Sequence, residues 1–195
     1  MRNPGECFFD FSVMTRELRS DERPQLLAHL LALGSEDRRL RFTHALTDSG
    51  LSWYADNIDL KDDVVFVVAD VNLAIVGAAH LTRCDGHAQL GLSVLPDGRG
   101  RGIGSALLER CIAHTRNWGM RVMFMNCLVE NAAMMRLARK QGLRIAVSGA
   151  EAEAFVRLPR ANLASLSTEA IVEQLALFDH AQKSCWLALQ ASLPQ

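Results

Sequence analysis

The chain has 195 residues, 49% of them apolar, which is enough for one well-buried core and too few for two comfortable domains. Its formal net charge is -1, from 21 basic and 22 acidic side chains, so composition gives no reason to expect binding to nucleic acid or to a membrane. Five widely spaced cysteines without a C-x-x-C pair predict reduced thiols and no metal site. The N-terminus lacks an apolar signal core and no apolar run could span a bilayer, so we expect a cytoplasmic protein.

The first third of the chain is predicted to be mainly helical, after a loose lead-in over residues 1–10 and a first strand over residues 11–18. Capping and stop residues mark the helix ends, because they satisfy or terminate the backbone hydrogen-bond ladder. The expected helices run from Asp21 to a stop at Gly34, from Ser35 onward, and after Thr47.

The middle of the chain predicts a sheet. Three β-rich runs separated by turn residues indicate a meander, and helices then alternate with strands, which favours an α/β (α+β) fold with a sheet covered on both faces. The three runs are 64–70, 73–81 and 88–95. The later elements are a helix ending at Gly119, a strand at 122–129, a helix at 131–141 and two strands within 143–158.

The C-terminal segment is expected to be an appendage to one domain that spans residues 1–158. Residues 159–167 read as a linker, and Thr168 is predicted to cap a final amphipathic helix. Its apolar stripe packs either on the same domain or on a second copy in a homodimer, because stripe width does not separate these two cases. The stripe contains Ile171, Leu175, Phe178, Cys185 and Leu189, with Trp186 and Leu193 beside it.

The most informative stretch runs from Val94 to Leu108 and reads VLPDGRGRGIGSALL. It combines the end of a strand, a turn at Pro96 and Asp97, a loop of glycines and arginines, and the start of a helix. Glycines let a backbone approach a ligand closely, and the free N–H groups of a helix N-terminus favour negative charge. The stretch therefore predicts a seat for a phosphate-bearing cofactor.

Two common nucleotide-binding templates do not match this stretch. A Walker loop needs a Gly-Lys pair, and no lysine lies near; the dinucleotide fingerprint needs a third glycine where Ser105 stands. Another diphosphate-binding mode remains a weaker alternative. The spacing Arg99-x-x-Gly102-x-Gly104 resembles the signature of the GNAT superfamily of acetyltransferases. That resemblance implies that the backbone amides of the loop hold the pyrophosphate of acetyl-CoA or another short acyl-CoA.

The resemblance covers roughly residues 11–158 and is strongest over residues 88–143. It implies the GNAT fold, a mixed and mostly antiparallel sheet of about six or seven strands flanked by helices, to which the C-terminal helix is an addition. The texture is most similar to bacterial protein-acetylating domains, which the RRLRF segment of residues 38–42 also resembles.

The resemblance also implies which residues hold the cofactor. The strand before the loop would pair its backbone with the pantetheine arm, and Asn131 would contact that arm while also capping a helix. At least one of the two loop arginines would reach a phosphate. The implied set is Leu92, Ser93, Val94, Arg99, Gly100, Arg101, Gly102, Ile103, Gly104, Ser105 and Asn131.

The catalytic residues are less well defined, because the chain departs from the family pattern twice. Gln89 stands where many relatives have a glutamate base, and Ala138 stands where many have a tyrosine acid. Period-two alternation places His87, Gln89, Gly91 and Ser93 on one face of their strand, so His87 is a candidate base and Ser93 could order a water. Glu130 is a further candidate carboxylate. His80, on a neighbouring strand, is expected to be a satisfied core or cleft histidine.

The resemblance predicts transfer of an acetyl group from acetyl-CoA to a primary amine by direct attack. The alternative is an acyl-CoA-binding sensor that has lost turnover, because the usual glutamate and tyrosine are missing. Residues 46–63 mix aromatic and acidic side chains and would form part of the acceptor wall, which suits a cationic amine or a protein lysine as well as a solvated loop.

Overall fold

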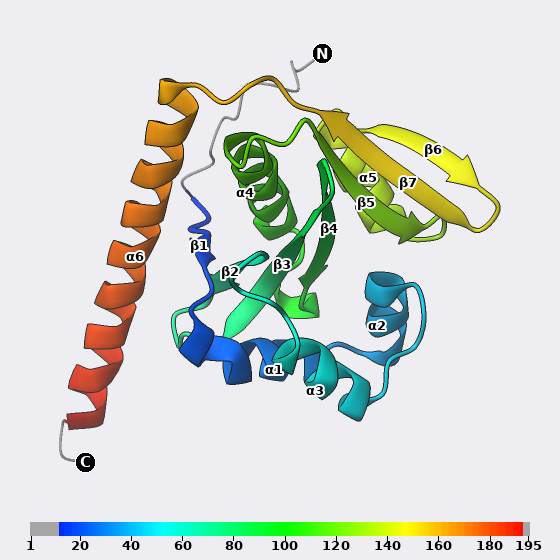
Figure 1. Ribbon diagram of the computed structural model, residues 1–195. Helices are drawn as coiled ribbons and strands as arrows, with labels where there is room; N and C mark the ends of the chain where they lie inside the picture. The colour runs from blue at the N-terminus through cyan, green and yellow to red at the C-terminus, as the bar shows by residue number, and fades with distance from the viewer. Residues whose placement is uncertain (1–11, 193–195) are drawn as a thin grey trace.

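The computed structural model describes residues 12–192, which form a sheet of seven strands in the order β1-β2-β3-β4-β5-β7-β6 (Figure 1). Only β4 and β5 pair in parallel; the other neighbours are antiparallel. This is the mixed, mostly antiparallel sheet expected from the sequence. The strands are β1 (Arg16–Glu17), β2 (Val64–Ala69), β3 (Ile75–Cys84), β4 (His87–Val94), β5 (Val122–Leu128), β6 (Arg144–Ser148) and β7 (Glu151–Arg157).

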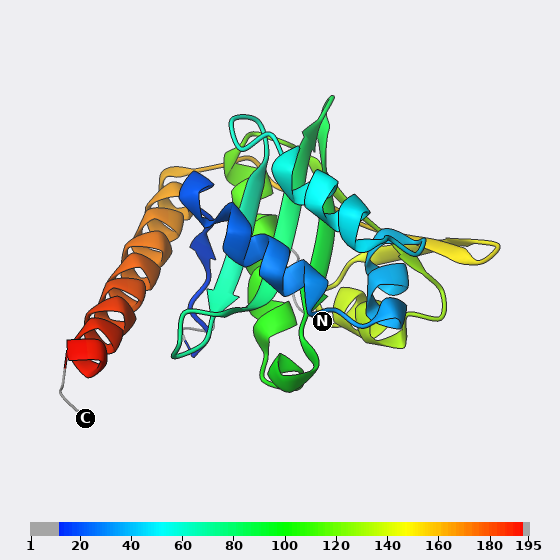
Figure 2. The same ribbon diagram turned by 90° about the horizontal axis from the view of Figure 1, so that it is seen from below.

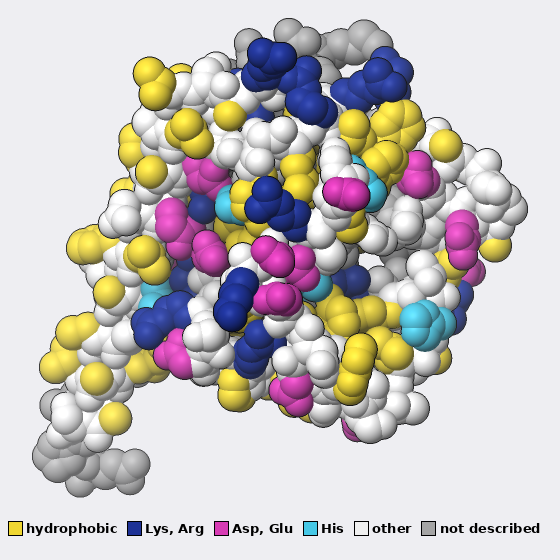
Figure 3. Space-filling model, in the orientation of Figure 1, with side chains coloured by type: hydrophobic (Ala, Val, Ile, Leu, Met, Phe, Trp, Pro, Cys, Tyr) yellow, Lys and Arg dark blue, Asp and Glu magenta, His cyan; other side chains and the backbone are white. Residues whose placement is uncertain are grey.

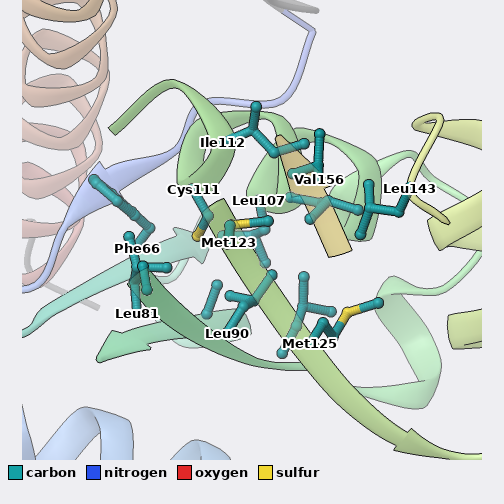
Figure 4. Packing of buried hydrophobic residues seen from close by; sticks show 14 of the residues in the cluster. Phe66, Leu81, Leu90, Leu107, Cys111, Ile112, Met123, Met125, Leu143 and Val156 are labelled. Carbon is teal, nitrogen blue, oxygen red and sulfur yellow. The ribbon is translucent and has the colours of Figure 1, made fainter. Parts of the chain in front are cut away.

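Helices cover both faces of the sheet. On one face lie α1 (Arg23–Leu31), α2 (Ser35–Phe42) and α3 (Asp48–Asp56), and Figure 2 shows α1 and α3 crossing the strands. On the other lie α4 (Ile103–Asn117) and α5 (Ala132–Lys140). The apolar run of β2 follows from this, since Val65 and Val67 pack toward α1 and α3 while Phe66 packs toward α4. Figure 4 shows the core on the α4 side, where Leu107 and Cys111 meet Phe66, Leu90 and Met123.

The chain start differs from the prediction. The expected strand over residues 11–18 is only Arg16–Glu17, and the lead-in over residues 1–10 lies outside the described residues. Asp21 falls in a 3-10 turn (Ser20–Glu22) instead of capping α1. The buried Glu22 carboxylate explains the turn, because it accepts two hydrogen bonds of 2.6 Å from the Arg16 guanidinium and one of 2.9 Å from the Arg19 amide. Gly34 precedes α2 as its N-cap and does not end α1.

The predicted start of the last helix was wrong as well. The helix α6 (Leu163–Ser192) begins before Ser167, and the Thr168 hydroxyl donates to the Ala164 carbonyl within it, at 2.8 Å. The cap is Asn162, whose side-chain oxygen accepts from the Ser165 amide at 2.8 Å while the Ser165 hydroxyl accepts from the Asn162 amide at 3.0 Å. This reciprocal pair satisfies free backbone donors at the helix start, so the cap lies six residues earlier than expected.

The helix α6 packs on its own domain through one face only. Val172 and Ala176 are its buried residues, and Glu169 and Glu173 contact Arg110 of α4. The predicted apolar stripe lies on the outer side instead, where Ile171, Phe178, Trp186 and Leu189 are each more than half exposed (Figure 3). Within residues 12–192, no helix is both long and apolar enough to cross a bilayer.

Candidate active site

The site is an opening between the two parallel strands of the sheet. Register pairs between β4 and β5 are confined to Ala88 with Met123 and Gln89 with Phe124. From Gly91 to Val94, β4 continues to pair with β3, whereas β5 pairs with β7 on its other side. The ladder between β4 and β5 therefore ends before Gly91, and the two strands diverge toward the C-terminal end of β4 (Figure 1).

A candidate anion seat lies at the mouth of this opening. After a short 3-10 turn (Pro96–Gly98), the loop passes through Gly100 and Gly102 at φ +75° and +81°, a backbone conformation that disfavours a side chain. Gly102 is the N-cap of α4, and the first helical hydrogen bond runs from the Ala106 amide to the Gly102 carbonyl at 3.0 Å. The amides of residues 103–105 therefore precede the intrahelical ladder and remain available to a phosphate.

Three cationic side chains surround this seat. The Arg99 guanidinium forms an ion pair of 2.6 Å with Asp37 of α2, so a phosphate would compete with this carboxylate for it. Arg101 is exposed. Lys140, at the end of α5, lies 3.5 Å from the Ser105 hydroxyl and was missed from the sequence. Its contact joins residues 35 positions apart, which only the packing of α5 on α4 brings together.

Asn131 lies at the other wall of the opening, at the start of α5. Its side-chain oxygen accepts from the Met134 amide at 3.1 Å, which makes it the N-cap of that helix. The residue is nine-tenths buried. The expected capping role is confirmed, and contact with a cofactor stays a prediction.

A family model for the GNAT acetyltransferases matches residues 26–143, which is more than half of the chain. The chain belongs to the GNAT acetyltransferase family. Membership supports acetyl transfer as the class of reaction, and it agrees with the loop, the open strand pair and the position of Asn131.

Solved GNAT structures share the fold at low sequence identity. The GNAT domain of S. lividans PAT has a TM-score of 0.64 and 19% identity, covering 74% of this chain and 89% of that one. Spermidine N-acetyltransferase from Vibrio cholerae, solved with CoA and spermine, has a TM-score of 0.59 and 16% identity over 74% and 95% of the two chains. The protein yncA from Salmonella typhimurium, solved with acetyl-CoA, gives 0.57 and 18% over 77% and 96%.

The alternation predicted for β4 holds in this GNAT sheet. Leu90 and Leu92 belong to the core beside α4, and Ser93 points to the opposite face, toward α1. There the Ser93 hydroxyl lies 2.9 Å from Nε2 of His29, whose Nδ1 lies 3.0 Å from the Ile75 carbonyl. Burial lowers the pKa of His29 to about 4, so its ring is neutral, Nδ1 donates to the carbonyl and Nε2 accepts from Ser93. The hydroxyl of Ser93 is thus already engaged.

Of the other two candidate catalytic residues, His87 lies away from the opening between β4 and β5, and Glu130 forms an ion pair. His87 is the first residue of β4 and lies at the end where β4 and β5 are still paired, about 13 Å along the strand from Gly91. Its Nδ1 lies 3.0 Å from the Asp85 carbonyl, and its ring packs on Phe124. Glu130 forms an ion pair of 2.7 Å with Arg39 of α2. Their catalytic roles remain predictions.

At the two family positions that differ, the environments are opposite. Gln89 is exposed on the face of β4 that carries Gly91. Ala138 is fully buried in the core on the α5 side. Alanine has no ionisable group, so position 138 cannot supply a proton to the CoA sulfur.

A polar network lies on the face of the sheet that α1 and α3 cover. Tyr54 of α3 joins His80 of β3 through a hydrogen bond of 2.7 Å, and His80 joins Asp63 at 3.0 Å. Arg41 of α2 donates to the same tyrosine oxygen at 3.1 Å. The four residues lie within a 40-residue stretch from 41 to 80, and their spacing in the sequence matches no motif.

A surface hollow of about 330 Å³ lies beside the end of α2, over the extension of the sheet formed by β5, β7 and β6. Thr43 and Asn126 line it together with the acidic side chains of Glu151 and Glu153. Both glutamates are exposed. The hollow can accommodate a small cationic group next to the open strand pair.

Proposed function

We propose that this protein transfers an acetyl group from acetyl-CoA to a primary amine by direct attack. The observation that carries the proposal is the set of free amides at residues 103–105, seated beside the opening between β4 and β5. A diphosphate on those amides would leave the pantetheine arm free to follow β4 from Val94 toward Gly91. The thioester would then reach the acceptor side of the sheet.

The acceptor side of the site suits a cationic amine. Glu151 and Glu153 give the hollow beside α2 a negative edge, which favours binding of an ammonium group. Acetylation of spermidine by one structural neighbour is compatible with such an acceptor. An ammonium with a pKa of about 10.4 must still lose a proton before it attacks, at a cost of about 4–5 kcal/mol at neutral pH.

Isothermal titration with acetyl-CoA tests the cofactor, and thiol release with spermine or a lysine-containing peptide tests the transfer. We expect saturable binding at micromolar cofactor and acceptor-dependent release of CoA. Absence of binding at high micromolar acetyl-CoA would overturn the proposal. Binding without transfer to either acceptor would instead favour the sensor alternative. That alternative rests on Gln89 and Ala138, which replace the usual catalytic glutamate and tyrosine.

We also propose that the outer stripe of α6 contacts a second copy of the chain. The charged side chains of α6 leave the stripe free, since Glu169 and Glu173 face Arg110 and Asp179 pairs with Lys183 at 2.7 Å. A charge-free apolar stripe can pack on its own copy about a two-fold axis. The stripe comprises Ile171, Leu175, Phe178, Trp186 and Leu189, exposed by 41% to 63%.

Light scattering after size exclusion checks this assembly. The wild type is expected to elute as a dimer and Phe178→Glu as a folded monomer, because the carboxylate would be buried without a partner. Val147→Glu, at an apolar position of β6 that is 59% exposed and remote from α6, is the matched control. A monomeric wild type, or a dimer that Phe178→Glu leaves intact, would contradict the proposal.

A further inference from the structure

Tyr54, His80 and Asp63 form a directed chain of hydrogen bonds. Burial lowers the pKa of His80 below its usual range, the charge of Arg41 lowers it further, and Asp63 opposes both effects. The ring is therefore neutral at pH 7 and carries one N–H. Because Nε2 lies 3.0 Å from the Asp63 carboxylate, the proton belongs there, and Nδ1 accepts from the Tyr54 hydroxyl at 2.7 Å.

The same tyrosine oxygen also accepts a hydrogen bond. Arg41 donates to it at 3.1 Å, and this guanidinium lies over the ring of Phe42, 4.8 Å from its centroid. A positive charge beside the oxygen stabilises negative charge that develops when the hydroxyl gives up its proton. The arrangement is that of an activated hydroxyl, with an imidazole base oriented by a carboxylate.

The hydrogen-bonded residues Tyr54, His80 and Asp63 lie at the point where the strand pair β4 and β5 opens. Gly91 is two residues beyond the last pair of β4 with β5, and its register partner on β3 is His80. The Arg41 guanidinium occupies the space over Gly91 so closely that a methyl group there would overlap it. The Tyr54 oxygen therefore lies on the acceptor face, and the Arg41 guanidinium lies between it and the β4 backbone along which the thioester would lie.

We propose that Tyr54 is the residue that takes the proton from the attacking amine, with His80 as the proton acceptor behind it and Asp63 as a positioning residue. This rests on the proposed function. The acceptor ammonium gives a proton to Tyr54 Oη while the hydroxyl proton passes to His80 Nδ1, which leaves a neutral amine. Its lone pair forms the C–N bond to the thioester carbon, and the C–S bond breaks.

The remaining protons also balance. When the C–S bond breaks, CoA departs as a thiolate, and the second proton lost by the nitrogen neutralises the sulfur. The proton on His80 passes to solvent, toward which its side chain and that of Asp63 retain 12% and 13% exposure. The relay thus replaces the glutamate that Gln89 lacks, with residues from α3, β3 and the segment before β2.

The test compares Tyr54→Phe with the wild type across pH 6 to 10, with acetyl-CoA and whichever of spermine and the lysine-containing peptide is the better acceptor. The variant keeps the ring that packs on Phe42, with centroids 5.1 Å apart, and loses only the hydroxyl. We expect kcat to fall on the order of 100-fold at pH 7, with unchanged acetyl-CoA affinity. The deficit should shrink as rising pH deprotonates the amine without help, whereas loss of a structural contact would give a deficit independent of pH.

Two further variants address the rest of the relay. Asp63→Asn should move the acidic limb of the pH profile, because it removes the carboxylate that fixes the His80 tautomer, and Gly91→Ala should lower kcat by displacing Arg41. If the wild type transfers acetyl and Tyr54→Phe stays within threefold of it at pH 7, the relay is overturned while the proposed function stands. A wild type that binds acetyl-CoA but transfers to neither acceptor overturns both.

Discussion

Gly102→Glu is expected to weaken acetyl-CoA binding by about 100-fold or more. Gly102 is the N-cap of α4 at φ +81°, next to the free amides of the helix start. A carboxylate there would occupy the field that favours anions and repel the incoming diphosphate, by about 4 kcal/mol at 4 Å in a partly screened site. Isothermal titration of the purified variant measures the loss.

Backbone strain is the competing explanation, and two matched variants separate it from charge. Gly102→Gln has nearly the same shape without the charge, so it should bind more tightly than Gly102→Glu. Gly119→Gln places the same residue at φ +82° at the opposite end of α4, where no atom lies within 4 Å of the added Cβ. Each costs about 1–2 kcal/mol of stability, but only the Gly102 variants should lose cofactor affinity. Equal affinity of Gly102→Glu and the wild type would place the diphosphate elsewhere.

Arg110→Met is expected to destabilise the fold by about 3–5 kcal/mol, because it leaves the Glu173 carboxylate without its buried cation. The Arg110 side chain is 3% exposed and lies 2.8 Å from Glu173 and 3.9 Å from Glu169, both on α6. Its guanidinium also lies 4.8 Å from the centroid of the Phe66 ring. Urea unfolding followed by circular dichroism measures the change.

The double variant Arg110→Met with Glu173→Gln should recover part of this loss, because it removes the charge that Arg110→Met leaves without a cation. Arg136→Met, at an exposed position of α5, is the matched control and should stay within about 0.5 kcal/mol of the wild type. A cost below 1 kcal/mol for Arg110→Met would mean that α6 is held by its apolar contacts alone.

The elements themselves were largely predictable from local signals. The start of α3 after Thr47 and the start of α5 after Asn131 are confirmed, since both caps accept the hydrogen bond that their residue types favour. Errors fell where a distant partner prevailed. Arg16, six residues from Glu22, turns the chain before α1, and the Asn162 and Ser165 pair starts α6 early.

In the candidate site, too, one part follows from local sequence and another depends on contacts between distant residues. The anion seat depends on a contiguous stretch, Arg99 to Gly104, whose backbone conformation is dictated by its own glycines. The polar groups beside the opening share no local pattern, and the hydrogen bond between Ser93 and His29 joins residues 64 positions apart. The two-residue alternation of a strand places His87 on the correct face of β4. It does not give the distance between His87 and the point where β5 separates from β4.

The sequence by itself determined the family, the order of helices and strands, and the glycine loop before α4, because each is encoded by neighbouring residues through backbone conformation and helix caps. Only the tertiary structure decided which side chains meet at the opening of the strand pair. Tyr54, His80 and Asp63 come together because α3 packs across β3, and Arg41 reaches Gly91 because that position has no side chain. Those contacts are set by the packing of helices on the sheet, for which a single chain carries no local signal.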